Sequence, residues 1–279
     1  MITCISNKLY DLMLLSLVHA FQYLPESKGP QTNADQRFQY QAKITLVPYH
    51  ALVFYSGWFC SGIIIGSKTI LTTASCLLEP NEQIVVKVGV ESIIDDGQII
   101  PVVEAKKHEF YEHLGQLDND IALLVLEHHV KFSDSVKKIV LAEADAALRP
   151  ASSFTVTGWG SSYQPQHRVK KLTRMPLVLQ NKESCEKAYE LKLTPSMFCG
   201  RYQQNRRLSD SGGAAVYSNR FLVGIASYTG PDNSDVAVFT NVSYFHKWIK
   251  INTIRFLRKH CKLNEDTVEI YGEYAYDHT

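Results

Sequence analysis

Residues 209–216 read Ser-Asp-Ser-Gly-Gly-Ala-Ala-Val, a turn of small residues that leads directly into an apolar run. Ser-Gly-Gly suits a tight turn, because glycine adopts backbone conformations that are costly for other residues. The apolar run that follows is typical of a buried strand. Alone, this stretch is a weak signal, and its meaning depends on what lies upstream.

Two further segments complete the pattern. Residues 118–124 read Asp-Asn-Asp-Ile-Ala-Leu-Leu, with polar residues at the start of a predicted strand. Residues 72–76 read Thr-Thr-Ala-Ser-Cys and follow an apolar run that ends at Leu71. The three segments therefore place hydroxyl and carboxylate side chains at the ends of apolar runs, in a fixed chain order.

The composition is that of an ordinary globular protein. The chain has 279 residues, 45% of them hydrophobic, and its 29 basic and 28 acidic side chains give a net charge of +1. This balance argues against a basic nucleic-acid-binding protein. No apolar run reaches the roughly 18 residues of a membrane span. We therefore expect neither a nucleic-acid partner nor a membrane span.

Short apolar runs rich in Val, Ile, Phe and Tyr alternate with turn residues from about Phe38 to Leu222. Regular short strands of this kind predict an all-β barrel or sandwich. Residues 243–257 differ, because their large apolar side chains recur at roughly helical spacing. They predict one C-terminal amphipathic helix, with Ser243 as its N-cap.

The first residues predict secretion. A short apolar stretch at 12–18 follows Lys8, and small residues precede a cleavage point after Ala20. We therefore expect a signal peptide at 1–20 and a flexible polar leader at 21–38; the alternative is a buried N-terminal helix. Cleavage would remove Cys4 and leave five cysteines, so one thiol is free or paired between chains. No Cys-x-x-Cys pair occurs, and we expect no metal site or cofactor.

Together the three segments resemble the chymotrypsin/trypsin family of serine proteases, where His, Asp and Ser form the catalytic triad in this chain order. The resemblance covers residues 39–254. It implies an all-β fold of two six-stranded antiparallel β-barrels with a C-terminal α-helix. Further segments that match the family are 58–62 (WFCSG), 108–111 (HEFY), 157–160 (TGWG), 197–200 (MFCG) and 224–228 (GIASY).

The resemblance also implies two disulfides, Cys60 with Cys76 and Cys185 with Cys199. Cys261 lies outside the family domain, in a tail at 255–279 that is first basic and then acidic and rich in tyrosine. This odd cysteine is a candidate for an intermolecular disulfide.

The general base of the family is missing. Ser75 stands where the resemblance places the catalytic histidine, while Asp120 and Ser211 remain as a vestigial triad. A serine hydroxyl cannot hold a proton near neutral pH as imidazole does, so Ser211 lacks the group that would activate it. Loss of this histidine alone costs about 10⁶-fold in a comparable triad.

Other family features also depart from the pattern. Ser209 replaces the glycine whose N–H, with that of Ser211, forms the oxyanion hole. Asn205 stands where trypsin-like members carry Asp, and Arg206 and Arg207 follow it. The specificity pocket implied by the resemblance comprises Asn205, Ser227, Thr229 and Ala237.

Activation departs from the family as well. Asp210 corresponds to the aspartate that pairs with the new N-terminal ammonium after zymogen cleavage. The chain has no Ile-Val-Gly-Gly sequence, and Arg37-Phe38-Gln39-Tyr40 lies at the approximate place. Cleavage after Arg37 is conceivable, and Asp210 is otherwise expected to be solvated or hydrogen-bonded locally.

These observations predict a secreted, non-catalytic serine protease homologue that acts as a binding module, a protease cofactor or decoy. Its partner would be an extracellular protein, either an active protease or its substrate. Two alternatives stay open: a trypsin-like endopeptidase with an unconventional base, for which His113 is the local candidate, and an extracellular assembly component linked through Cys261. Asn241 lies in the one Asn-x-Ser/Thr sequon and is a glycosylation candidate.

Overall fold

The computed structural model describes residues 40–55, 57–77, 83–143, 151–160, 170–189, 192–203, 208, 210–229 and 235–261. The chain divides into two compact units. One is the body Tyr40–Ile249, and the other contains the described residues from Lys250 onward. The predicted signal peptide and leader lie outside the described residues.

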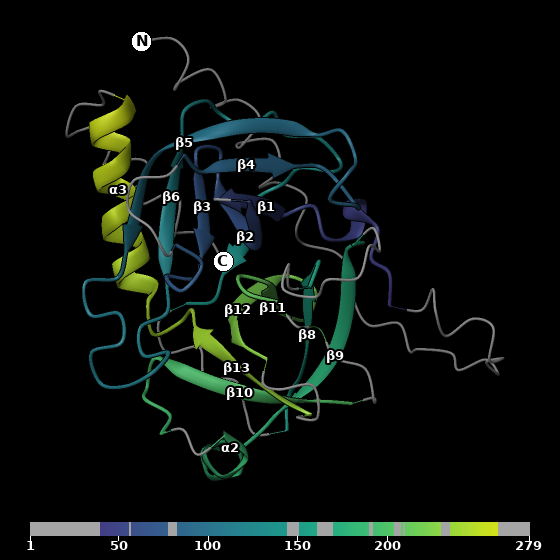
Figure 1. The fold of residues 1–279 in the computed structure, drawn as a ribbon, viewed down its shortest axis with the longest axis vertical. Helices are drawn as coiled ribbons and strands as arrows, with labels where there is room; N and C mark the ends of the chain where they lie inside the picture. Colours follow the sequence, from purple (N-terminus) through teal and green to yellow (C-terminus); the bar gives the residue numbers. More distant parts are fainter. Residues whose placement is uncertain are drawn as a thin grey trace, which may run out of the picture. The chain divides into compact units, whose positions relative to one another are not determined.

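The first half of the body is a closed barrel of six antiparallel strands (Figure 1). The strands pair in the order β1-β2-β3-β6-β5-β4. They are β1 His50–Tyr55, β2 Trp58–Gly66, β3 Thr69–Thr72, β4 Val85–Val88, β5 Gln98–Lys107 and β6 Ala122–Leu126. A short 3-10 helix, η3 Ile44–Leu46, precedes them.

The second half closes in the same way. Its sheet has the order β11-β8-β9-β10-β13-β12, and pairing of β11 with β12 completes a ring of six antiparallel strands. One short additional strand of two residues, β7, pairs parallel to β12 and was not expected from the sequence. The strands are β7 Val140–Leu141, β8 Ser153–Gly158, β9 Thr173–Leu179, β10 Met197–Tyr202, β11 Ala214–Tyr217, β12 Phe221–Tyr228 and β13 Val236–Asn241. The predicted pair of six-stranded barrels is thus confirmed.

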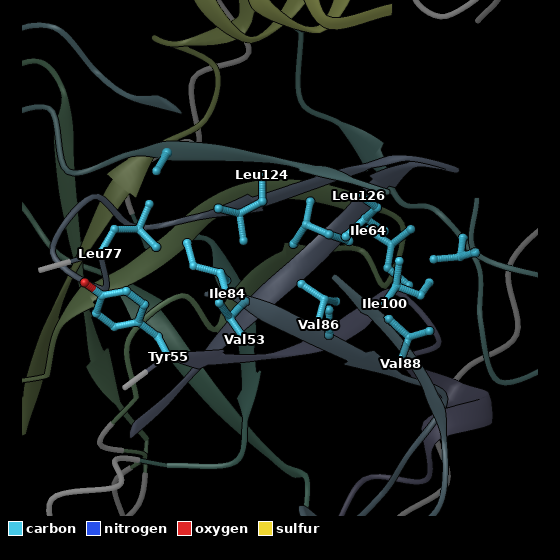
Figure 2. Close-up of a cluster of buried hydrophobic side chains, with 14 of the residues drawn as sticks. Val53, Tyr55, Ile64, Leu77, Ile84, Val86, Val88, Ile100, Leu124 and Leu126 are labelled. Atoms are coloured by element: carbon cyan, nitrogen blue, oxygen red, sulfur yellow. The ribbon is translucent and has the colours of Figure 1, made fainter. Parts of the chain in front are cut away.

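Each barrel has its own apolar core. In the first, strand β6 is buried along its whole length and faces side chains from the other five strands (Figure 2). In the second, Phe154 and Phe198 both pack against the fully buried ring of Phe239. The apolar runs identified in the sequence supply these cores, because burying apolar area is the main favourable contribution to folding.

Two α-helices accompany the barrels. Helix α2, Lys182–Tyr189, was not predicted; Asn181 caps it by accepting a hydrogen bond from the Ser184 amide at 2.9 Å. Helix α3 runs from His246 to Cys261, so it begins three residues later and ends four residues later than predicted. The hydroxyl of Ser243 donates to Asn241 Oδ1 instead of capping α3. The predicted tail therefore begins as helix.

Both disulfides implied by the resemblance are present. Cys60 in β2 is bonded to Cys76, and Cys185 in α2 is bonded to Cys199 in β10. Each closes a short loop within one barrel and contributes about 2–4 kcal/mol to stability. Within the described residues, no helix is both long enough and apolar enough to cross a membrane.

Candidate active site

Asp120 is the buried centre of the site. It lies just before β6 in the first barrel and is inaccessible to solvent. Oδ1 accepts a hydrogen bond from the Ser75 amide at 2.7 Å, and Oδ2 accepts from the Ser75 hydroxyl at 2.9 Å and the Ser227 hydroxyl at 2.5 Å. Burial raises the pKa of the Asp120 carboxyl, and these hydrogen bonds partly oppose the increase.

The second barrel supplies two of the groups that hold Asp120. Ser227 belongs to β12, and Thr240 in β13 donates its hydroxyl to the backbone oxygen of Asp120 at 2.7 Å. Asp120 therefore joins the ends of strands from both barrels. Its side chain has every oxygen occupied by a hydroxyl or amide donor.

Ser211 lies on the turn before β11, and its hydroxyl has a hydroxyl partner. Ser211 Oγ is 2.8 Å from Thr73 Oγ1. Thr73 is two residues from Ser75, so the segment after β3 contacts both Ser211 and Asp120. Among the hydrogen bonds of the described residues, neither Ser211 Oγ nor the Asp120 carboxylate contacts an imidazole.

The turn at Ser211 is held tightly by its backbone. The Ser61 amide donates to the Ser211 carbonyl at 2.8 Å, and the Gly212 amide donates to the Ala226 carbonyl at 2.8 Å. Gly212 has φ +84°, and a Cβ there would lie 1.8 Å from the Ser61 carbonyl oxygen. This turn requires glycine for both its conformation and its close approach to β2.

Asp210, next to Ser211, is a second buried carboxylate. Oδ2 accepts from the Ser61 hydroxyl at 2.7 Å, and Oδ1 accepts from the Ser211 amide at 3.0 Å. Burial raises the pKa of Asp210 to about 7, because the two hydrogen bonds and the charge of Lys170 oppose it only in part. Asp210 is thus hydrogen-bonded, with one local donor, the Ser211 amide, and one donor from the first barrel, the Ser61 hydroxyl.

Two histidines, the predicted candidate His113 and the buried His50, contact residues other than Asp120 and Ser211. His113 is exposed, and its ring packs on Phe110 with ring centroids 5.6 Å apart. His50 is fully buried at the start of β1, where Nε2 hydrogen-bonds with Thr157 Oγ1. Burial lowers the pKa of His50 to about 3, so this ring is neutral at physiological pH.

The predicted specificity pocket is described only in part. Ser227, Thr229 and Ala237 are buried, and Ala237 in β13 pairs with Gly200 in β10. Ser227 hydrogen-bonds Asp120 and thus belongs to the carboxylate cluster. Ser209, Asn205, Arg206 and Arg207 lie outside the described residues.

The glycosylation candidate and the odd cysteine both lie within the described residues, and their predicted roles stay predictions. Asn241 ends β13, and its side-chain oxygen accepts the Ser243 hydroxyl at 2.8 Å. Cys261 is the last residue of α3. In the part of the chain that the structure describes, no group of three or more His, Cys, Asp or Glu side chains is arranged to hold a metal ion.

Sequence reasoning missed two contributors to this site. Thr73 was quoted only as part of a motif, and its contact with Ser211 spans 138 residues. Ser61 was noted only within the matching strand at 58–62, yet its hydroxyl reaches Asp210 across 149 residues. The sequence did contain a signal for Ser61, because the family has Phe-Cys-Gly-Gly in this strand. Serine adds a side-chain hydroxyl donor where glycine has no side chain.

Comparisons with known proteins agree with this architecture. Residues 37–249 match the family named Trypsin. Cathepsin G of Mus musculus is 32% identical over 203 residues, which cover 71% of this chain and 76% of that protein. Trypsin 5G1 of Aedes aegypti is 29% identical over 202 residues, with 70% and 75% covered.

Two solved structures show the same fold. The scabies mite inactivated protease paralogue S-I1 has a TM-score of 0.69 at 24% identity and covers 77% of this chain and 98% of its own. Neuropsin, a serine protease of mouse brain, has a TM-score of 0.66 at 25% identity, with 77% and 98% covered. With two closed barrels, the motif order and a family match over most of its length, this chain belongs to the trypsin family of serine proteases.

Proposed function

We propose that this protein is a secreted, non-catalytic serine protease homologue that uses the protease scaffold to bind another extracellular protein. The observation that carries the proposal is the position of Ser75. Its amide and its hydroxyl each donate a hydrogen bond to the carboxylate of Asp120. In the family, this carboxylate orients the catalytic imidazole. Ser75 thus takes the place of the general base without being able to act as one.

The chemical argument rests on proton affinity. A general base must hold a proton near neutral pH, which imidazole does and an alcohol does not. Ser211 without a base remains a neutral alcohol and a poor nucleophile. The expected loss, about 10⁶-fold, is larger than any single compensating interaction supplies.

The position of Ser211 supports the same conclusion. Its hydroxyl is paired with Thr73 Oγ1 at 2.8 Å, so its hydrogen-bonding partner is another alcohol. Such a pair stabilises the turn but removes no proton from Ser211. We infer that Asp120 and Ser211 persist because they organise the ends of the strands around them.

Related folds support a role without catalysis. The paralogues S-I1 and S-D1 of the scabies mite are described as inactivated proteases, and both share this fold. The named relatives include trypsins and cathepsin G, so the scaffold is also that of proteases. Two disulfides support an oxidising, extracellular location.

Fluorophosphonate labelling of the purified protein tests this proposal, because the reagent reports on an activated serine nucleophile. We expect no labelling of the natural protein and measurable labelling of a Ser75→His variant. Ser133→His, at an exposed position of the same barrel, controls for adding an imidazole elsewhere. Ser211→Ala in the Ser75→His background should abolish the signal.

The opposite result would be equally clear. Labelling of the natural protein that is lost in Ser211→Ala would overturn the proposal, since a base would then be supplied from another position. His113→Ala would identify that base if it removed the labelling.

A further inference from the structure

Asp210 is buried beside the Ser211 turn, and every hydrogen bond that the structure gives its carboxylate comes from an uncharged donor. The donors are the Ser61 hydroxyl at 2.7 Å and the Ser211 amide at 3.0 Å. The side chain is fully enclosed. Lys170 exerts a favourable charge on Asp210, but its Nζ lies over the Phe59 ring, 5.5 Å from the centroid.

The pocket around Asp210 is closed by glycines. A Cβ at Gly158 would lie 1.5 Å from Asp210 Oδ2, and one at Gly213 would lie 2.7 Å from the same atom. The carboxylate is thus packed directly against two backbone segments of the second barrel. Its remaining contact, through Oδ2, is with the first barrel.

Ser61 provides that contact and two others. Its amide donates to the Ser211 carbonyl at 2.8 Å, its hydroxyl donates to Asp210, and its carbonyl accepts the Thr72 hydroxyl at 2.8 Å. Residues 60 to 63 of β2 are paired with β1, and Ser61 is completely buried. A rigid strand therefore holds both residues 210 and 211 from one side.

We propose that Ser61 is an internal anchor that holds the Asp210–Ser211 turn in its final conformation in the uncut chain. The turn then needs no ammonium from a new N-terminus, and cleavage after Arg37 does not switch its conformation. Ser61 is a positioning residue that acts through Asp210. This inference concerns the conformation of the turn and is independent of whether Ser211 reacts.

The geometry explains why a hydroxyl suffices. A buried carboxylate needs donors, and removing one leaves an acceptor unsatisfied at a cost that exceeds the net value of an ordinary hydrogen bond. Ser61 fills this requirement from within the fold. Its hydroxyl donates whether Asp210 is ionised or protonated, because a protonated carboxyl keeps acceptor capacity.

Hydrogen exchange measured on the uncut protein tests the anchor. Arg37→Gln prevents tryptic cleavage, and Ser61→Ala is introduced in that background. We expect amides 211–213 to exchange about tenfold faster or more in Ser61→Ala, as loss of a hydrogen bond to a charged group implies. Ser196→Ala is the matched control, because it removes a hydroxyl from another buried carboxylate, Asp118, at 2.9 Å.

A second readout uses reactivity. In the Ser75→His background, uncut protein should be labelled by fluorophosphonate, Ser61→Ala should reduce that labelling at least tenfold, and Ser196→Ala should not. If Ser61→Ala fails to accumulate, Ser61→Gly removes the same hydroxyl and restores the residue type of the family's strand. If the Ser75→His variant is not labelled, the hydrogen exchange of amides 211–213 alone tests whether Ser61 anchors the turn.

Two results would overturn the anchor. One is equal exchange of amides 211–213 in Ser61→Ala and Ser196→Ala. The other is a tenfold or greater slowing of exchange when the natural chain is cleaved after Arg37, which would mean that a new N-terminus orders the turn. Neither result bears on labelling of the natural protein, so a failure here is distinguishable from failure of the proposed function.

Discussion

Asp120 and Asp210 are two buried carboxylates that differ in the hydrogen-bond donors around them. Both have a raised pKa because of burial, and both accept hydrogen bonds from serine hydroxyls. Among the described residues, the side chain of Asp120 accepts from Ser75 twice and from Ser227, whereas that of Asp210 accepts from Ser61 and Ser211. The comparison teaches that hydroxyl and amide donors alone can hold a buried carboxylate, with three such donors around Asp120 and two around Asp210.

The largest loss of folding stability should come from a substitution that fills the space occupied by the Asp210 carboxylate. Gly158→Ala would place a methyl group 1.5 Å from Asp210 Oδ2 and expel the carboxylate from its pocket. We expect a loss of about 4 kcal/mol or more, the range of severe core changes. Gly66→Ala is the control, since its Cβ would meet Thr69 only at 3.6 Å. Thermal unfolding measures both, and equal stability of the two variants would show that Asp210 can leave at little cost.

The next largest effect is the pH dependence of folding stability that comes from the Asp210 carboxyl. The folded-state pKa of Asp210 is about 7 against a reference value of 3.8, so the folded protein binds more protons than the unfolded chain between these values. Stability conferred by this group is therefore greatest below about pH 4 and is lost as the pH rises to 7.

Asp210→Asn should remove this dependence. The variant should gain stability relative to the natural protein between pH 4 and pH 7, by at most about 4 kcal/mol at 1.36 kcal/mol per unit. Denaturant unfolding across that range measures the gain. A constant difference between the two proteins at all pH values would show that Asp210 does not titrate there.

Asp120 should respond more weakly to the same change. In Asp120→Asn the amide oxygen can accept from the Ser75 amide, while the NH₂ group donates to the Ser75 and Ser227 hydroxyls, which also accept. We expect unfolding free energies within about 1 kcal/mol of the natural protein. In the Ser75→His background, however, the same substitution should lower fluorophosphonate labelling by about 10⁴-fold, because it favours the wrong imidazole tautomer. Unchanged labelling there would mean that Asp120 does not orient the introduced ring.

The smallest effect concerns the hydroxyl pair. Thr73→Val removes the partner of Ser211 Oγ and should cost about 1 kcal/mol, the net value of one hydrogen bond. In the Ser75→His background it should raise labelling, since Ser211 then has the imidazole as its remaining partner. Thr69→Val, at the first residue of the strand β3 that Thr73 follows, provides a control for the change of shape. Lower labelling in Thr73→Val would show that Thr73 helps to position Ser211.

The fold was largely predictable because it depends on local patterns. The short apolar runs form the strands, as residues 51–55 do in β1, 122–126 in β6 and 221–227 in β12, and both disulfides follow from the resemblance. Helix α2 was missed because most of its eight residues are polar and give little periodic signal. Helix α3 ends later than predicted because its basic last turn was assigned to the tail. Basic side chains in fact suit a helix C-terminus, where they interact favourably with the helix dipole.

The site was predictable only in its named residues. Ser75, Asp120 and Ser211 were identified from their motifs, but the contacts that define the site were not. Ser61 with Asp210 and Thr73 with Ser211 join residues more than 130 positions apart, and no local pattern encodes such a pair. The departures from the family were visible in the sequence, whereas their hydrogen-bond partners required the fold.

The positions of the two disulfides have a consequence for how the protein unfolds. They close sequence separations of 16 and 14, each within one barrel, so neither ties one barrel to the other. The connection is instead reciprocal: Asp120 of the first barrel accepts from Ser227 of the second, and Asp210 of the second accepts from Ser61 of the first. If either barrel opened alone, the buried carboxylate of the other barrel would lose one of its hydroxyl donors. The barrels should therefore unfold together in one cooperative transition, even though no covalent cross-link in the described residues joins them.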